Sequence, residues 1–203
     1  GEIVYGLGAI KGLGEGPINA IISAREAGGP FTSLLDFCQR VDLKTVNKSA
    51  LEAVVRAGAI DLLHPGDTDS IRARLMASIA ETVQAAEQSS RNEEAGVLDL
   101  FGDIAPVETG NDSDSDDGLV AARPWSQQQR LREEKETLGL YLSGHPIDEF
   151  LPELKQLTRD RLAGLRADRS YQLIAGLLVG VRTMRNKRGD MIAFLTLDDR
   201  SGR

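Results

Sequence analysis

The chain has 203 residues, of which 41% are hydrophobic and only 4% aromatic, and its formal net charge at pH 7 is −7. This length allows one large or two small domains with a packed core. The single cysteine, Cys38, excludes an internal disulfide and a zinc site built from cysteines. No apolar run has the length of a membrane span and no signal peptide opens the chain, so we expect a cytoplasmic protein without a membrane partner.

The negative charge is concentrated in one segment. Residues 92–118 contain nine acidic residues and no Lys or Arg. Outside this segment, 24 basic residues face 22 acidic ones, so the rest of the chain is nearly neutral. Any nucleic-acid binding would therefore depend on a few placed contacts and not on a broad basic face.

The first feature along the chain is a glycine-rich bend, Gly12-Leu13-Gly14, followed by Gly16 and Pro17. The fixed φ of proline suits a first helical position, so a helix is predicted to begin at Pro17. Two glycines around an apolar residue permit a tight hairpin with a positive φ and exposed backbone N–H groups. Beside a helix N-terminus such amides can bind a phosphate oxygen, as expected of a helix-hairpin-helix motif on a DNA backbone.

This glycine-rich run has two other interpretations. Neither the dinucleotide pattern G-x-G-x-x-G nor the P-loop pattern G-x-x-x-x-G-K-[ST] is matched from Gly6 or from Gly12, which argues against a nucleotide-binding enzyme. A plain turn between two packed helices remains open at this point.

Residues 1–63 are predicted to form a compact unit in which a helix–loop–helix pattern occurs twice. The first repeat ends at Gly28-Gly29. In the second repeat, Thr32 or Ser33 caps one helix, Asn47 caps the next, and Gly58 ends it. The second hairpin lacks the Gly-x-Gly sequence. Its lysines, Lys44 and Lys48, are candidate phosphate contacts or else solvated surface residues.

Four further parts are expected along the chain. Residues 64–91 form a helical extension, with an apolar stripe that includes Ile71, Leu75 and Ile79. An acidic linker over 92–122 and a helical connector over 123–168 follow. The first helix of this connector is expected over 126–142, with Gly144 stopping it. Residues 169–203 are predicted to form β-strands around a turn at 186–190. Because two strands do not make a domain, and because Gly1 stands in place of Met, we expect a piece of a longer protein.

An apolar island interrupts the acidic linker. It comprises Val97, Leu98, Asp99, Leu100 and Phe101. Adjacent apolar anchors in a polar segment are typical of a docking peptide. Alternatively, these side chains fold back onto the preceding helix.

Three segments, in order, resemble the alpha subunit of bacterial DNA polymerase III, the C-family replicative polymerase. Residues 3–18 are similar to its helix-hairpin-helix region and residues 136–146 to the segment that leads to its OB domain. Residues 187–199 are similar to its early OB strands. The resemblance implies a mainly α fold (tandem helix-hairpin-helix) with an acidic flexible linker and an incomplete OB-fold at the C-terminus.

The resemblance also implies two kinds of DNA contact. The tandem motif would grip nascent duplex through the backbone amides of Gly12, Leu13, Gly14 and Gly16, with Lys11 adding positive charge. The complete OB domain would handle the single-stranded template. The basic residues of its first strands either lie along that groove or serve solubility, and they are Arg182, Arg185, Lys187 and Arg188.

In the family, a pentapeptide between these domains anchors the polymerase to the sliding clamp. Residues 97–101 align with it, so that Leu100 and Phe101 would fill an apolar pocket and Asp99 would help fix the extended backbone. Val97 stands where Gln is usual, which removes a polar anchor. The implied partners are duplex DNA, single-stranded template, the sliding clamp and other replicase subunits.

The family's catalytic carboxylates, which hold Mg²⁺, lie in a palm domain upstream of the matching region. We therefore expect no catalysis, no metal site and no cofactor in this chain, although Mg²⁺ is expected for the parent polymerase. His64 and His145 stand alone beside prolines and are expected to be structural. The alternative function is an adaptor that docks a partner through Leu98–Phe101 without binding DNA.

Overall fold

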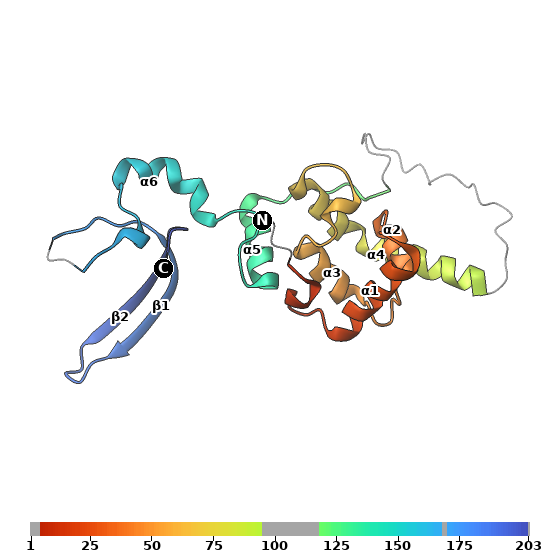
Figure 1. Cartoon of the computed structure of the whole chain (residues 1–203), viewed down its shortest axis with the longest axis horizontal. Helices are drawn as coiled ribbons and strands as arrows, with labels where there is room; N and C mark the ends of the chain where they lie inside the picture. The colour runs from red at the N-terminus through yellow and green to blue at the C-terminus, as the bar shows by residue number, and fades with distance from the viewer. Residues whose placement is uncertain (1–4, 95–117, 168–169, 203) are drawn as a thin grey trace. The chain divides into compact units, whose positions relative to one another are not determined.

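The computed structural model describes residues 5–94, 118–167 and 170–202. It divides into two compact units, residues 1–141 and 142–203, and each is described by itself. The first unit is helical, and the second combines short helices with a two-stranded antiparallel sheet (Figure 1). The expected mainly α fold with an incomplete β part is confirmed.

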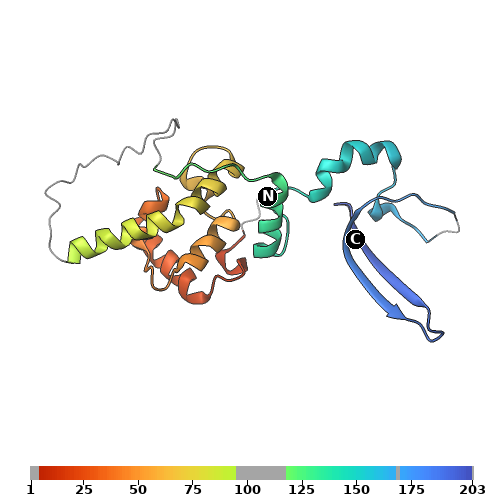
Figure 2. The same ribbon diagram turned by 180° about the vertical axis from the view of Figure 1, so that it is seen from behind.

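The first unit contains five α-helices and two short 3₁₀ helices among its described residues. In chain order they are η1 (Leu7–Ala9), α1 (Glu15–Gly28), α2 (Leu34–Arg40), α3 (Lys48–Arg56), η2 (Asp61–Leu63), α4 (Thr68–Glu94) and α5 (Gln127–Leu138). Helices α2 and α3 pack on α4, and α5 packs on α3. Figure 2 shows α1, α2 and α3 gathered around the first part of α4, whose C-terminal end projects past them.

One hydrophobic core joins both helix–loop–helix repeats to α4. Ile71, Leu75 and Ile79 of the predicted stripe are buried in it, with exposed fractions of 3%, 0% and 1%. The cluster also includes Leu13 from the glycine-rich bend and Leu138 from α5. Helices α4 and α5 thus contribute to the core of the tandem repeats.

Local sequence determines most of the helix ends. The side chains of Ser33 and Asn47 accept hydrogen bonds from backbone amides three residues on, as N-caps do. Gly29 and Gly58 have φ +78° and +74° just after α1 and α3. At this C-terminal position glycine is favoured because it has no Cβ to clash.

Two predicted helix ends were wrong. Helix α1 begins at Glu15, so Pro17 occupies its third position and not its first. This is tolerated because first-turn N–H groups have no partner within the helix. Helix α5 ends at Leu138 and not at Gly144, because Gly139 adopts φ +79° and ends the helix in a left-handed cap.

A buried ion network fastens α5 to α4. Arg72 of α4 is 3% exposed and donates to Asp61 at 2.9 Å and to Glu134 of α5 at 3.0 Å. Glu134 is fully buried. Near the other end of α5, Arg130 pairs with Asp69 at 2.6 Å.

The second unit contains η3 (Pro146–Phe150), α6 (Leu151–Leu157), η4 (Leu162–Gly164), β1 (Leu177–Arg185) and β2 (Met191–Asp198). The strands pair around the predicted turn at 186–190, with a bulge between Leu178 and Gly180. Residues 171–176, expected to be β, lie outside the strand because Leu177 opposite Asp198 is the last pair.

Candidate nucleic-acid interface

The glycine-rich bend lies at the surface of the first unit, directly before α1. Gly12, Gly14 and Gly16 are exposed, whereas Leu13 between them is buried. Gly12 has φ +84°, which glycine adopts without steric cost. Gly14, the N-cap of α1, has φ −74° and needs no positive φ. The bend therefore turns at Gly12 and is anchored in the core by Leu13.

The bend exposes backbone N–H groups that no acceptor in the described residues uses. Within the described parts of the chain, the amides of Gly12 and Gly14 donate no hydrogen bond. The Leu13 amide, also predicted to contact phosphate, instead donates to the Ile10 carbonyl at 3.2 Å. Gly16 lies in the first turn of α1, a helix of 14 residues whose N-terminus carries the positive end of the dipole. This arrangement has the chemistry of an anion site.

Helix α5 supports the bend from a distant part of the sequence. The Lys11 amide donates to the Thr137 carbonyl at 2.8 Å. The Lys11 side chain lies near the end of α5, since a Cβ built at Gly139 would be 3.6 Å from its Nζ. Lys11 is exposed and directly precedes Gly12 in the sequence.

The second hairpin lies next to the first but is built differently. A Cβ built on Gly16 would be 3.5 Å from the Thr45 methyl group, which places the two loops side by side. In the second loop the Asp42 carboxylate accepts hydrogen bonds from the Lys44 amide at 3.1 Å and from the Thr45 hydroxyl at 2.6 Å. These bonds lower the pKa of Asp42, the Thr45 hydroxyl contributing most. Lys44 and Lys48, the predicted contacts, are both exposed.

Comparison with known proteins supports the sequence interpretation. Residues 1–69 match a family described as a helix-hairpin-helix motif. The whole chain is similar to proteins named DNA polymerase III subunit alpha, at 49% identity over 213 residues in Pseudomonas aeruginosa. The identity is 48% over 206 residues in Vibrio cholerae and 44% over 206 residues in Escherichia coli K12.

The chain matches a segment of the DNA polymerase III alpha subunit along its entire length. The resemblance inferred from three short motifs is thus confirmed. The chain spans only 17–18% of the length of these relatives.

Within this polymerase-like segment, the second unit holds the other predicted DNA contacts. Arg182 faces Phe194 across the sheet and Arg185 faces Met191. Because the two arginines are three residues apart on one strand, they lie on opposite faces. Lys187 and Arg188 lie in the turn, where the Arg188 amide donates to the Asn186 side chain at 2.8 Å. All four cations are exposed, and they are spread along the sheet and its tip.

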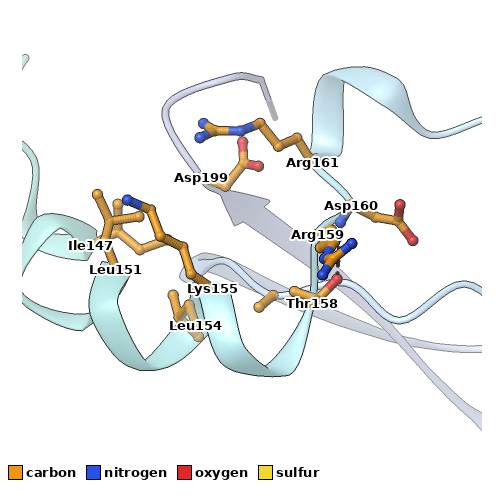
Figure 3. Close-up of a pocket in the computed structure, with 10 residues that line it drawn as sticks. Ile147, Leu151, Leu154, Lys155, Thr158, Arg159, Asp160, Arg161 and Asp199 are labelled. Carbon is orange, nitrogen blue, oxygen red and sulfur yellow. Dashed lines mark hydrogen bonds between the residues drawn. The ribbon is translucent and has the colours of Figure 1, made fainter.

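A cavity of about 250 Å³ also lies in the second unit, between α6 and the end of β2. Ile147, Leu151 and Leu154 form an apolar wall, and Lys155, Arg159 and Arg161 stand around it. Figure 3 shows that these cationic groups point in different directions and do not converge on one point. Asp199 in its wall is already used, because it accepts from the Leu162, Ser201 and Gly202 amides.

The two histidines and the cysteine have structural surroundings. His64 accepts a hydrogen bond from the Leu34 amide at 3.3 Å, and His145 accepts one from the Ile147 amide at 3.2 Å. Cys38 is fully buried. In the residues the structure describes, no group of three His, Cys, Asp or Glu side chains could hold a metal ion. No helix among them is long and apolar enough to cross a membrane.

The predicted clamp-binding residues Val97, Leu98, Asp99, Leu100 and Phe101 lie outside the described residues. The described residues that follow them, Leu119 and Val120, are fixed to α4. The Val120 amide donates to the Ser78 hydroxyl at 2.8 Å, and Arg74 donates to the Leu119 carbonyl at 3.3 Å.

Sequence reasoning missed the residues that hold the bend in place. Glu134 follows Leu131 by three residues and precedes Leu138 by four, so it lies on the buried stripe of α5. That spacing was a detectable signal of a buried charge, and such a charge needs a partner. Thr137 gave no such signal, because it contributes its backbone carbonyl.

Proposed function

We propose that this chain is a non-catalytic DNA-binding segment of a replicative DNA polymerase, in which the first hairpin grips the phosphates of duplex DNA. The observation that carries this proposal is the exposed bend at Gly12–Gly16, whose free amides adjoin the N-terminus of α1. Such a site binds a phosphate oxygen and makes no contact with base edges. The grip would therefore be independent of DNA sequence, which suits an enzyme that must copy every sequence.

Neighbouring lysines would extend this contact along the backbone. Lys11 lies beside the bend, and Lys44 and Lys48 lie on the adjacent second repeat. Each phosphate neutralised by a cation adds about 0.9 to the slope of log affinity against log salt. A slope of about 2 to 4 is expected for so few contacts.

The second part of the proposal is docking to a sliding clamp through residues 97–101. Leu100 and Phe101 supply the two adjacent apolar anchors, and acidic residues surround them in the sequence. Other replicase subunits are further expected partners. We assign the chemistry of polymerisation, with its Mg²⁺ ions, to other parts of a longer cytoplasmic polymerase.

The third part concerns single-stranded template. Arg182, Arg185, Lys187 and Arg188 are exposed on β1 and its turn, and Phe194 on β2 is 52% exposed beside Arg182. Cations next to an exposed aromatic ring fit a backbone-and-base contact with a single strand. A complete OB domain would be needed to form that groove.

The test is fluorescence anisotropy with a labelled duplex at several salt concentrations. Gly12→Val is expected to weaken binding about tenfold and to reduce the salt slope, since a side chain at φ +84° reshapes the bend. Gly29→Val is the matched control, because Gly29 has φ +78° and open space at the other end of the same helix. Equal affinity of the two variants would contradict the hairpin role.

The same experiment tests the adaptor alternative. If the unmodified chain binds no duplex at any salt concentration, yet still binds a sliding clamp, then the chain is a docking adaptor and the DNA-binding proposal is wrong.

A further inference from the structure

The two hairpins differ in what their backbone amides already hold. In the first, the amides of Gly12 and Gly14 donate to no acceptor in the described residues. In the second, the Asp42 carboxylate accepts from the Lys44 amide and the Thr45 hydroxyl, at 3.1 and 2.6 Å. The Asp42 carbonyl accepts from the Thr45 and Val46 amides at 3.0 and 2.7 Å. Asp42 therefore holds four donors of the second loop, two through its carboxylate and two through its main-chain carbonyl.

We propose that Asp42 acts as an internal substitute for phosphate: it occupies the Lys44 amide and the Thr45 hydroxyl of the second hairpin and leaves only the lysine side chains of that hairpin to contact DNA. This inference rests on the proposed duplex binding. A carboxylate and a phosphate oxygen both accept hydrogen bonds from backbone amides, so they compete for the same donors. The carboxylate is part of the loop and is always present, whereas a phosphate must arrive from solution.

The negative charge of Asp42, like its hydrogen bonds, disfavours phosphate binding at the second hairpin. Asp42 is exposed, and its hydrogen bonds with Thr45 and Lys44 lower its pKa, so the carboxylate is ionised at neutral pH. Thr45 lies against Gly16 of the first hairpin, which brings this negative charge close to the proposed phosphate site. The Lys44 ammonium offsets part of that charge.

The two hairpins therefore have different roles. The first hairpin is glycine-rich and its amides are open to phosphate, whereas the amides of the second are held by Asp42 and the loop packs against the first. A weaker grip has a physical advantage for a segment that must move along DNA, since every additional phosphate contact has to break at each step.

The test compares Asp42→Asn with Asp67→Asn in duplex binding at low salt. Asp67 is the matched control, since it is also exposed and accepts from the amide and hydroxyl of Ser70 at 3.2 and 3.3 Å. Asp42→Asn keeps an acceptor for the Lys44 amide but removes the charge. It is expected to bind duplex about fivefold more tightly, and Asp67→Asn to bind as the unmodified chain does.

A second variant, Asp42→Gly, removes the carboxylate that accepts from the Lys44 amide as well as the charge, and keeps the main-chain carbonyl. It is expected to raise the slope of log affinity against log salt by about 0.9, the value for one more phosphate contact. Thermal unfolding followed by circular dichroism shows that each variant is folded.

The outcomes separate the two proposals. Salt-dependent binding by the unmodified chain with no gain in either Asp42 variant overturns the role of Asp42 alone. An equal gain in Asp42→Asn and Asp67→Asn also overturns it, because the effect is then one of net charge. An unmodified chain that binds no duplex overturns both proposals.

Discussion

The Arg72 guanidinium lies 3.0 Å from the Glu134 carboxylate, and both side chains are buried, with exposed fractions of 4% and 0%. This pair joins α4 to α5, which residues 95–126 separate in the sequence. Three residues after Glu134, the Thr137 carbonyl accepts the Lys11 amide at the glycine-rich bend. A buried ion pair thus fixes the helix that holds the proposed phosphate site.

Removal of the Glu134 charge is expected to destabilise the first unit strongly. Glu134→Gln leaves the Arg72 guanidinium buried with Asp61 as its remaining charged partner among the described residues, which should cost about 3 kcal/mol of unfolding free energy. Urea unfolding followed by the fluorescence of the single tryptophan, Trp125, measures this cost.

The neighbouring residue provides the control. Glu133→Gln makes the same chemical change at a partly exposed ion pair with Arg56, at 3.3 Å, and should cost less than about 1 kcal/mol. Similar losses of unfolding free energy in the two variants would show that the buried ion pair stabilises the fold no more than the partly exposed one.

Gly58→Ala is expected to be far more damaging than other glycine substitutions at positive φ. A Cβ at Gly58 would overlap the Arg72 guanidinium and lie 2.9 Å from an Asp61 oxygen. Gly29→Ala carries the same backbone cost, about 1 kcal/mol, but meets open space. In denaturant unfolding, the free energy of unfolding of Gly58→Ala should be at least about 2 kcal/mol lower than that of Gly29→Ala. Equal stabilities would contradict the tight packing around Arg72.

Cys38 is expected to be unreactive in the folded protein. Burial raises the pKa of its thiol from 9.0 to about 12, so the reactive thiolate is absent at neutral pH. An aromatic disulfide reagent at pH 8 should therefore label Cys38 only after urea is added. Rapid labelling of the native chain would show that this part of the core opens readily.

The same shift predicts a loss of stability in alkali. The folded pKa of Cys38 lies above the unfolded one, so the unfolded chain releases its proton first as the pH rises through 9. The free energy of unfolding should fall from about pH 9 towards pH 12, and Cys38→Ala should remove this part of the fall. An unchanged alkaline profile in Cys38→Ala would contradict the assignment.

Clamp binding is expected to depend on two apolar residues of the segment 97–101. The double variant Leu100→Ala and Phe101→Ala should abolish capture by an immobilised sliding clamp, because it removes both anchors. Val97→Gln should tighten binding, since it restores the polar residue usual in the family. Leu62→Ala is the control, as Leu62 is a fully exposed leucine elsewhere in the first unit. Retained binding by the double variant would contradict this docking site.

The sequence was sufficient for features with a local cause. The caps at Ser33, Asn47 and Gly58, the apolar stripe of α4 and the turn at 186–190 follow from side-chain chemistry within a few residues. The glycine-rich bend belongs to the same group, because its positive φ and its exposure need only Gly12 and its neighbours.

Features that need two distant segments could not be predicted in this way. The Lys11–Thr137 hydrogen bond joins two backbone groups, which leave no trace in side-chain identity. The pairing of Glu134 with Arg72 requires the packing of two helices that one segment separates. The Asp42 turn is local, but its consequence depends on the contact between Thr45 and Gly16. The ends of α1 and α5 shifted because glycine and proline tolerate more than one position in a helix terminus.

The segment that leaves α4 after Glu94 returns to the same helix at Ser78. A protease cut between residues 95 and 117 would therefore break the covalent chain without dividing the folded unit. The ion pairs of α5 with α4 and its hydrogen bond to Lys11 would still hold the two pieces together. A protein that bound this segment and pulled on it would pull on α4 at two points, its C-terminal end and Ser78.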